Sequence, residues 1–262
     1  MAHIAVLQLI IAGSLMILTT LTLRVLYVLR HIRRSNVTQL KGKPASPFHM
    51  VIVLGSGGHT AEMMSLIRDI DPKRCKHRTY IVSSGDNFSS GKALEIEKRI
   101  QSNCSSTNTS LVTLEGQDDA SFGMWDIKIV PRARKIHQSL ITAPASSLWC
   151  LLGCLKALYT TARDSKVSPG EFPDIIVTNG PATAVIFIFA AILLKILGLV
   201  PVSKLRIIYV ESWARVVTLS LSGKILLKLG ICEKFIVQWE VLAKSINGSG
   251  RNRVEWPGFL VE

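Results

Sequence analysis

The glycine-rich turn after the first strand-like segment constrains the fold of this chain more than any other sequence feature. Phe48 to Leu54 is a compact apolar and β-branched run, which is typical of a buried strand. The turn Gly55-Ser56-Gly57-Gly58-His59-Thr60 follows directly, and residues 61–69 have helical character. A strand, a glycine turn and a helix in this order open α/β domains of the nucleotide-binding type.

The same alternation continues through the rest of the chain. Further strands are predicted at 78–83, 127–130, 174–177, 205–210 and 235–237, and further helices at 92–100 and 182–194. Strands that alternate with helices predict a mostly parallel sheet covered on both faces. We therefore predict a Rossmann-like α/β domain over residues 48–253. Residues 102–123, rich in Ser, Thr, Asn and Asp, are predicted to be a mobile excursion without an assigned role.

An apolar segment precedes this domain. Ile4 to Leu23 contains no charged residue, and apolar character continues past Arg24 to Leu29. This length is enough for a helix to cross a hydrocarbon core of about 30 Å. No basic residue precedes the run and no small-residue cleavage site follows it, so an uncleaved anchor is favoured over a signal peptide. We predict one transmembrane helix over residues 4–29.

The distribution of charge predicts which way this helix points. The chain of 262 residues has a formal net charge of +13, yet no acidic residue occurs before Glu62. Basic residues all follow the start of the helix, at Arg24, Arg30, Arg33, Arg34, Lys41 and Lys43. By the positive-inside rule, residues 1–3 are lumenal, residues 30–47 form a basic linker, and the domain is cytosolic. Basic residues beside a membrane helix favour anionic lipid as their partner and argue against nucleic acid.

A second apolar segment, residues 138–155, is charge-free. It is predicted to be either a core helix or a helix in the membrane interface with Trp149 at the headgroups, and both readings stay open. Its cysteines, Cys150 and Cys154, are predicted to be core or lipid-facing. The five cysteines of the chain lack the spacing of a disulfide framework or a zinc site, which is consistent with a reducing compartment and no metal.

The glycine turn is a candidate anion site, because backbone N–H groups and a helix N-terminus favour phosphate. Thr60 stands where the dinucleotide fingerprint needs a third glycine or alanine, and no Walker pattern is present, so no cofactor is predicted. His59 is either a general base or phosphate ligand, or a helix-start residue bonded to backbone. Glu62 either caps the helix or tunes His59.

Two further polar turns follow predicted strands, Asn179-Gly180-Pro181 and Glu211-Ser212. Ligands of open α/β sheets bind at this edge. Glu211 is either a proton acceptor or sugar ligand, or the partner of Arg215 in a helix. The basic cluster of residues 131–135 contacts lipid headgroups or an acceptor pyrophosphate, or is a solvated face. The apolar tail, residues 254–262, packs on its own domain or docks on a partner.

Taken in order, these motifs resemble a known family. They are Gly55-Ser56-Gly57-Gly58-His59-Thr60-Ala61-Glu62, Asn179-Gly180-Pro181, Tyr209-Val210-Glu211-Ser212, Thr218-Leu219-Ser220-Leu221-Ser222-Gly223-Lys224 and Phe235-Ile236-Val237-Gln238-Trp239. So arranged, they resemble the membrane-anchoring subunit of the eukaryotic UDP-N-acetylglucosamine transferase of the dolichol pathway. More distantly, the glycine turn with its histidine is similar to the N-terminal domain of the bacterial transferase that makes lipid II.

The resemblance implies a GT-B glycosyltransferase that is split between two chains. This chain would be the N-terminal, acceptor-side half at the endoplasmic reticulum membrane, and a small cytosolic partner would bind UDP-N-acetylglucosamine. The pair would add the second N-acetylglucosamine to dolichyl-pyrophosphate-N-acetylglucosamine through an inverting, metal-free reaction that gives a β1,4 link. Membrane lipids and the preceding N-acetylglucosamine-phosphate transferase of the pathway are further partners that the resemblance suggests.

The resemblance also suggests roles for particular residues. His59 and Glu211 are the catalytic candidates, with His59 taking the proton from the attacking 4-hydroxyl. The acceptor and its pyrophosphate are assigned to Gly55, Ser56, Gly57, Gly58, Thr60, Asn179, Gly180, Arg132 and Arg134. Partner docking is assigned to Trp256, Phe259, Leu260 and Val261. A pure scaffold without catalytic residues is the alternative, whereas a nicotinamide-dependent reductase is disfavoured by Thr60 and by the lack of an acidic residue to hold the ribose.

Overall fold

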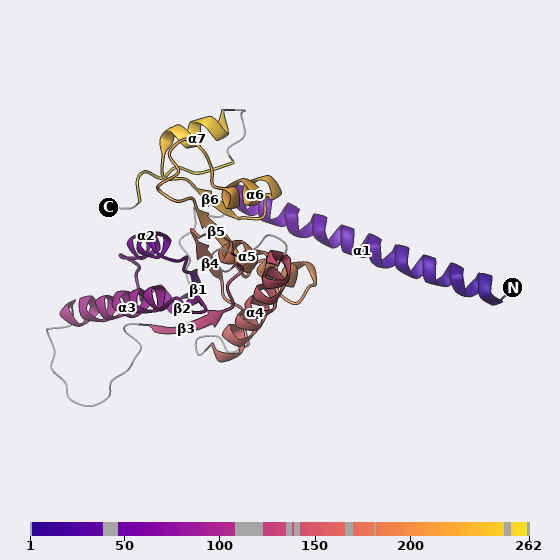
Figure 1. Ribbon diagram of the computed structural model, residues 1–262, viewed down its shortest axis with the longest axis horizontal. Helices are drawn as coiled ribbons and strands as arrows, with labels where there is room; N and C mark the ends of the chain where they lie inside the picture. Colours follow the sequence, from indigo (N-terminus) through magenta and orange to yellow (C-terminus); the bar gives the residue numbers. More distant parts are fainter. Residues whose placement is uncertain are drawn as a thin grey trace.

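The computed structural model describes residues 2–38, 47–107, 123–134, 138, 142–165, 170–180, 182–248 and 253–260 (Figure 1). A six-stranded sheet has the order β3-β2-β1-β4-β5-β6, and every pair of neighbours is parallel. Its strands are β1 Phe48–Val53, β2 Cys75–Ser83, β3 Met124–Val130, β4 Ile175–Thr178, β5 Arg206–Val210 and β6 Lys234–Ile236. This is the Rossmann strand order, so the predicted fold class is confirmed.

Helices cover both faces of the sheet, as predicted. After the N-terminal helix α1 (Ala2–Thr38) they are α2 Gly58–Leu66, α3 Asn87–Thr107, α4 Ala143–Asp164, α5 Thr183–Ile196, α6 Leu221–Leu229 and α7 Glu240–Asn247. Figure 1 shows α2 and α3 on one side of the sheet and α4 and α5 on the other. A hydrophobic core lies on each face of the sheet, and strand β1 contributes to both. Val51 and Val53 face α4 and α5, and Ile52 faces α2 and α3. This alternation follows from the two-residue period of a strand.

Helix α1 projects far from the domain (Figure 1). Among the described residues, one helix is long and apolar enough to cross a membrane, over His3–Arg34. The prediction of a linker from residue 30 was wrong for residues 30–38, which continue the helix. The helix continues because Val28 and Ile32 are fully buried in the domain core and Arg24 Nη2 donates to the Lys195 carbonyl at 3.2 Å. Residues 39–46 lie outside the described part of the chain.

Helix α4 packs one face on the core, as the first of the two readings predicted, and the membrane-interface reading stays a prediction. Its inner face buries Cys150, Cys154 and Leu158 completely, so both cysteines are core residues. Its outer face leaves Trp149 67% and Leu152 51% exposed. The helix begins at Ala143 rather than at residue 138, with Pro144 in its first turn, where the missing N–H of proline costs no hydrogen bond.

Helix α3 is longer than predicted. It runs to Thr107, so residues 102–107 are helical and the expectation of an irregular excursion was wrong there. The N-terminal end of α3 is stabilised by Asp86, whose carboxylate accepts from the Ser89 backbone N–H at 3.0 Å. Residues 108–122 of the predicted excursion lie outside the described residues.

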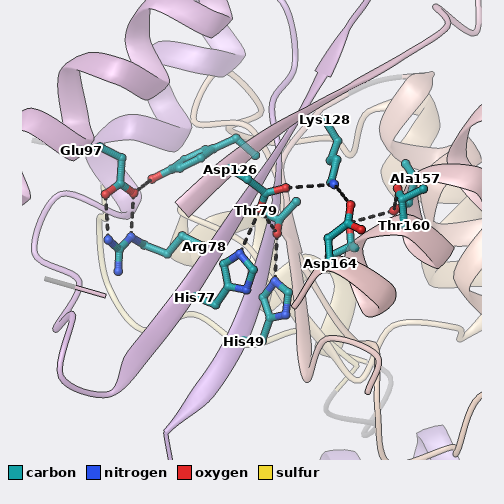
Figure 2. A network of polar contacts seen from close by, with 12 residues as sticks. His49, His77, Arg78, Thr79, Glu97, Asp126, Lys128, Ala157, Thr160 and Asp164 are labelled. Atoms are coloured by element: carbon teal, nitrogen blue, oxygen red, sulfur yellow. Dashed lines mark hydrogen bonds and ion pairs between the residues drawn. The ribbon is translucent and has the colours of Figure 1, made fainter. Parts of the chain in front are cut away.

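A polar network joins residues near the beginnings of β1, β2 and β3 (Figure 2). The rings of His49 and His77 stack with centroids 3.9 Å apart. Thr79 Oγ1 donates to Asp126 at 2.6 Å, so it accepts from His49 Nε2–H at 2.9 Å. Burial, and next the positive charge that His77 can carry, lower the pKa of His49 from 6.5 to about 3. His49 is therefore neutral in the folded chain at every pH near neutrality.

This network predicts that acid destabilises the domain. Between the unfolded pKa of 6.5 and the folded pKa of about 3, the unfolded chain binds a proton at His49 that the folded chain does not. The free energy of unfolding should therefore fall by about 2 kcal/mol between pH 7 and pH 5 on account of this residue. Denaturant unfolding of the full chain in detergent measures it, and His49→Gln, which keeps a donor toward Thr79, should flatten the profile. An equal acid loss in the variant would contradict the assignment.

Candidate functional site

The candidate site is an open cavity of about 620 Å³ at the carboxyl edge of the sheet. Residues that follow four different strands line it: His59 after β1, Arg134 after β3, Asn179 after β4 and Glu211 after β5. Apolar side chains of α5 and α6 complete its wall at Val185, Ile186, Leu221 and Ile225. Open α/β sheets bind ligands at this edge, beside the point where the strand order reverses. The cavity thus has a polar end made by loops and an apolar end made by helices.

Backbone contacts explain the glycines of the first turn. A Cβ on Gly55 would lie 2.7 Å from the His59 Cβ, and a Cβ on Gly180 would lie 3.2 Å from the Gly55 Cα. Gly57 has φ +61°, which glycine adopts without strain. Gly55 and Gly180 are therefore required for two turns to pack together. Ser56, Gly57 and Gly58 are exposed at the start of α2. The leading N–H groups of a helix have no acceptor in a preceding turn, and in this turn the Thr60 N–H is already bonded to the Gly57 carbonyl.

Thr60 does not face the cavity. Its side chain is fully buried, its hydroxyl donates to the Gly55 carbonyl and contacts Ser89 Oγ at 2.6 Å, and its N–H donates to the Gly57 carbonyl at 3.0 Å. Both donor groups are thus used inside the chain. Thr60 supports the turn, and this placement argues against its predicted contact with a pyrophosphate.

His59 is the titratable residue of the turn that reaches the cavity. Its side chain is 33% exposed, while its Nδ1 atom is buried without a hydrogen-bond partner, 3.8 Å from Glu62 Oε2. The ring therefore has one nitrogen enclosed by protein and the other available toward the cavity. This arrangement suits proton transfer to or from a bound hydroxyl.

Asn179 is buried, with 1% of its surface exposed, and its amide orientation is fixed. The Nδ2 group donates to the His59 carbonyl at 3.0 Å, which leaves Oδ1 buried without a partner at the cavity wall. An amide oxygen accepts hydrogen bonds only, and ionised phosphate oxygens have no hydrogen to donate. Asn179 therefore suits a sugar hydroxyl or an acetamido N–H better than the pyrophosphate that was one of its predicted ligands.

Glu211 holds the loop that follows β5. Its carboxylate accepts from the Ser212 N–H at 3.1 Å and from the N–H and hydroxyl of Ser220 at 3.1 and 3.0 Å. Burial raises its pKa, and the hydrogen bonds from Ser220 oppose that rise. No ion pair joins it to Arg215 within the described residues, so that alternative was wrong. A Cβ on Gly223 would overlap Glu211 Oε2, which explains this glycine.

The two predicted arginines differ in placement. Arg134 lines the cavity, whereas the Arg132 Nε donates to the Ser84 carbonyl at 2.8 Å and is absent from the cavity wall. A cation that sequence reasoning did not assign to the ligand, Arg215, lines the cavity beside the Glu211 loop. A single arginine between apolar residues has no distinguishing pattern, so the sequence suggests Arg215 only as a partner of Glu211.

The first residues of the C-terminal tail pack on the α/β domain of the same chain. Glu255 pairs with β6, accepting from the Val237 N–H at 2.9 Å and donating to the Phe235 carbonyl at 2.8 Å. Beyond this bridge, Phe259 meets Trp239 edge-on at 5.4 Å but stays 48% exposed. Trp256 is 44% exposed, Leu260 is partly buried, and Val261 lies outside the described residues. The tail thus contacts its own domain and also presents apolar surface.

The α/β domain that forms the cavity matches a known protein family over nearly its whole length. Residues 50–258 match the family described as "Oligosaccharide biosynthesis protein Alg14 like". The chain belongs to the Alg14 family. It is 35% identical over 235 residues to the UDP-N-acetylglucosamine transferase subunit alg14 of Aspergillus fumigatus, with 76% of this chain and 100% of the relative covered. The corresponding subunit of Schizosaccharomyces pombe is 34% identical over 227 residues, covering 87% of this chain and 92% of that one.

A mammalian relative has a similar level of sequence identity. The Alg14 subunit of Rattus norvegicus is 32% identical over 206 residues, covering 78% of this chain and 82% of that protein. A crystal structure of Acinetobacter baumannii MurG has a TM-score of 0.46 at 10% identity over 74% of this chain. This chain spans 43% of that structure's length. The resemblance drawn from the motifs is confirmed at the level of the Alg14 family.

Proposed function

We propose that this chain is the membrane-anchoring, acceptor-binding subunit of a two-subunit N-acetylglucosaminyltransferase. The observation that carries the proposal is the cavity in which His59, Asn179 and two arginines meet at the carboxyl edge of the sheet, in a chain of the Alg14 family. The relatives are named as subunits of a UDP-N-acetylglucosamine transferase, which supports a partner chain that supplies the donor-binding half of a GT-B enzyme.

The proposed reaction joins the acceptor 4-hydroxyl to C1 of the donor sugar. The bond between C1 and the UDP oxygen breaks, UDP leaves with the electron pair, and the hydroxyl proton passes to His59 Nε2. Attack from the face opposite to UDP inverts C1 and gives the β1,4 link. Asn179 Oδ1 accepts a hydrogen bond from the acceptor sugar, and Arg134 and Arg215 balance the charge of its pyrophosphate.

Glu211 is the weaker of the two catalytic candidates. Both of its oxygens already accept hydrogen bonds from the protein, so taking a proton would disrupt the loop at Ser220. His59 Nδ1 accepts or donates no hydrogen bond, and the side chain lines the cavity, so its other ring nitrogen is free to meet a ligand. This difference supports His59 as the base, with Glu211 shaping the wall.

The anchor supports the placement of this reaction at a membrane. The first part of α1 is apolar and exposed, whereas Val28 and Ile32 are buried in the domain, so the helix joins membrane and domain without a flexible joint. We place the domain on the cytosolic face of the endoplasmic reticulum, where the dolichol-linked acceptor and membrane lipids are within reach. The exposed Trp256 and Phe259 of the tail, with Leu260 and Val261, would bind the catalytic partner.

Reconstitution tests this function. The full chain and its cytosolic partner, purified together in detergent, should transfer sugar from UDP-N-acetylglucosamine to dolichyl-pyrophosphate-N-acetylglucosamine, while either chain alone should form no product. Removing residues 256–262 should abolish partner pull-down, since that segment carries the exposed Trp256 and Phe259. A variant that changes only the exposed Lys244 to alanine is the control. Absence of the chitobiose product from the assembled pair would refute the proposal.

A further inference from the structure

Glu62 is a buried carboxylate next to His59, which lines the cavity, and the proposed reaction does not yet use it. It is one helical turn after His59 in α2, and only 3% of its surface is exposed. It does not cap its helix, since the cap residue Gly57 has no side-chain hydrogen bond and Glu62 bonds to other segments. A buried carboxylate is costly unless hydrogen-bonded. Its partners therefore indicate what its position serves.

One carboxylate oxygen connects the loops that build the cavity. Glu62 Oε1 accepts from the Trp213 backbone N–H and from Gln238 Nε2, each at 2.6 Å. Gln238 also donates to the Glu211 carbonyl at 3.1 Å. These partners follow β5 and β6, so Glu62 ties helix α2, which carries His59, to the ends of both strands. The carboxylate is thereby held from several sides.

The other oxygen faces the histidine. Glu62 Oε2 is 3.8 Å from His59 Nδ1, and this nitrogen is buried without another partner. A carboxylate only accepts hydrogen bonds, so the arrangement favours the tautomer with hydrogen on Nδ1. The lone pair is then on Nε2, on the cavity side.

We propose that Glu62 is a positioning residue for the transfer reaction. It holds His59 in the Nδ1–H tautomer before reaction and stabilises the imidazolium that forms when Nε2 takes the proton from the acceptor hydroxyl. Carboxylates that orient a catalytic histidine act in this way in other enzymes. This inference rests on the proposed function, because it needs His59 to be the base.

The test is a double-mutant cycle in the assembled two-subunit enzyme. Glu62→Gln keeps the side-chain shape and the oxygen that accepts from Trp213 and Gln238, but it turns an amide donor toward His59 Nδ1 and so favours the wrong tautomer. We expect kcat to fall at least tenfold, with the KM of acceptor and donor changed less than about threefold. Added to His59→Ala, the same substitution should cause no further loss beyond about twofold.

The outcomes separate a positioning role from a structural one. A merely structural Glu62 would lower the activity of His59→Ala by the same factor as it lowers the wild type, and this would overturn the proposal. Unchanged kcat in Glu62→Gln, or loss of partner pull-down, would also overturn it. Glu95→Gln, at an exposed position of α3, is the control and should stay within about twofold of wild type. If the wild-type pair itself forms no product, the proposed function fails before any variant is compared.

Discussion

Replacing His59 with alanine is expected to lower sugar transfer by roughly a hundredfold or more, the scale of a lost general base. The ring lies at the cavity wall, and its Nδ1 atom is enclosed by protein. The substitution should leave the glycine turn intact, because Gly55 packs on Gly180 through backbone atoms and alanine keeps the Cβ that lies beside Gly55. The measurement is kcat of the full chain assembled with its partner, per molecule of bound partner.

Partner pull-down from membranes separates loss of chemistry from loss of assembly in this experiment. His3→Ala, which changes an exposed histidine at the start of α1, serves as the matched control and should leave transfer unchanged. If His59→Ala retains transfer with the partner bound, His59 is structural. The chain would then be a membrane scaffold that recruits its partner and contributes no catalytic residue.

Replacing Arg78 with methionine is expected to cost about 3–5 kcal/mol in the free energy of unfolding, because it leaves a buried charge without its partner. Figure 2 shows Arg78 directed at Glu97. Arg78 Nε and Nη2 donate to the two oxygens of Glu97 at 2.6 and 2.7 Å, and the Tyr80 hydroxyl donates to the same carboxylate at 2.7 Å. Arg78 and Tyr80 are fully buried, and Glu97 is 1% exposed. Denaturant unfolding of the full chain in detergent measures the loss.

The paired substitution Arg78→Met with Glu97→Gln should recover part of this loss, since it removes both charges together. Lys92→Met breaks the exposed Lys92–Glu95 pair on α3 and is the control, with an expected change below about 0.5 kcal/mol. Equal losses for the exposed and the buried pair would mean that burial is not what makes the Arg78–Glu97 pair important.

The elements of the sheet were predictable because their signal is local. Strand β1 was expected at residues 48–54 and is found at Phe48–Val53, since a short apolar run between turn residues has few alternatives to a buried strand. The expected strand at 78–83 starts earlier, at Cys75. Its first part contains the polar residues Lys76 and His77, so a hydrophobicity pattern does not indicate a strand there. His77 is nevertheless buried, where its ring bonds to Asp126.

Helices α1 and α4 show where local patterns were insufficient. The charge cluster after Leu29 suggested a linker, yet the helix continues to Thr38 because Val28 and Ile32 find a buried surface on the domain. The apolar segment with Trp149 fitted two environments equally well. In the folded chain the inner face of α4 packs on the core and Trp149 is exposed. Periodicity alone cannot decide which face is buried, because it does not say which element packs against the helix.

By itself, the sequence determined the alternation of strands and helices, the parallel sheet, the apolar N-terminal helix and the location of His59, Asn179 and Glu211 at one sheet edge. Each of these follows from patterns within a few residues and from the rule that parallel strands end at the same edge. Only the tertiary structure decided what each polar group does. The partners of Glu62 are 151 and 176 positions away, and the partner of Asn179 is 120 positions away. Buried polar atoms must be satisfied by whatever packing brings near, so their roles become visible only when distant segments meet.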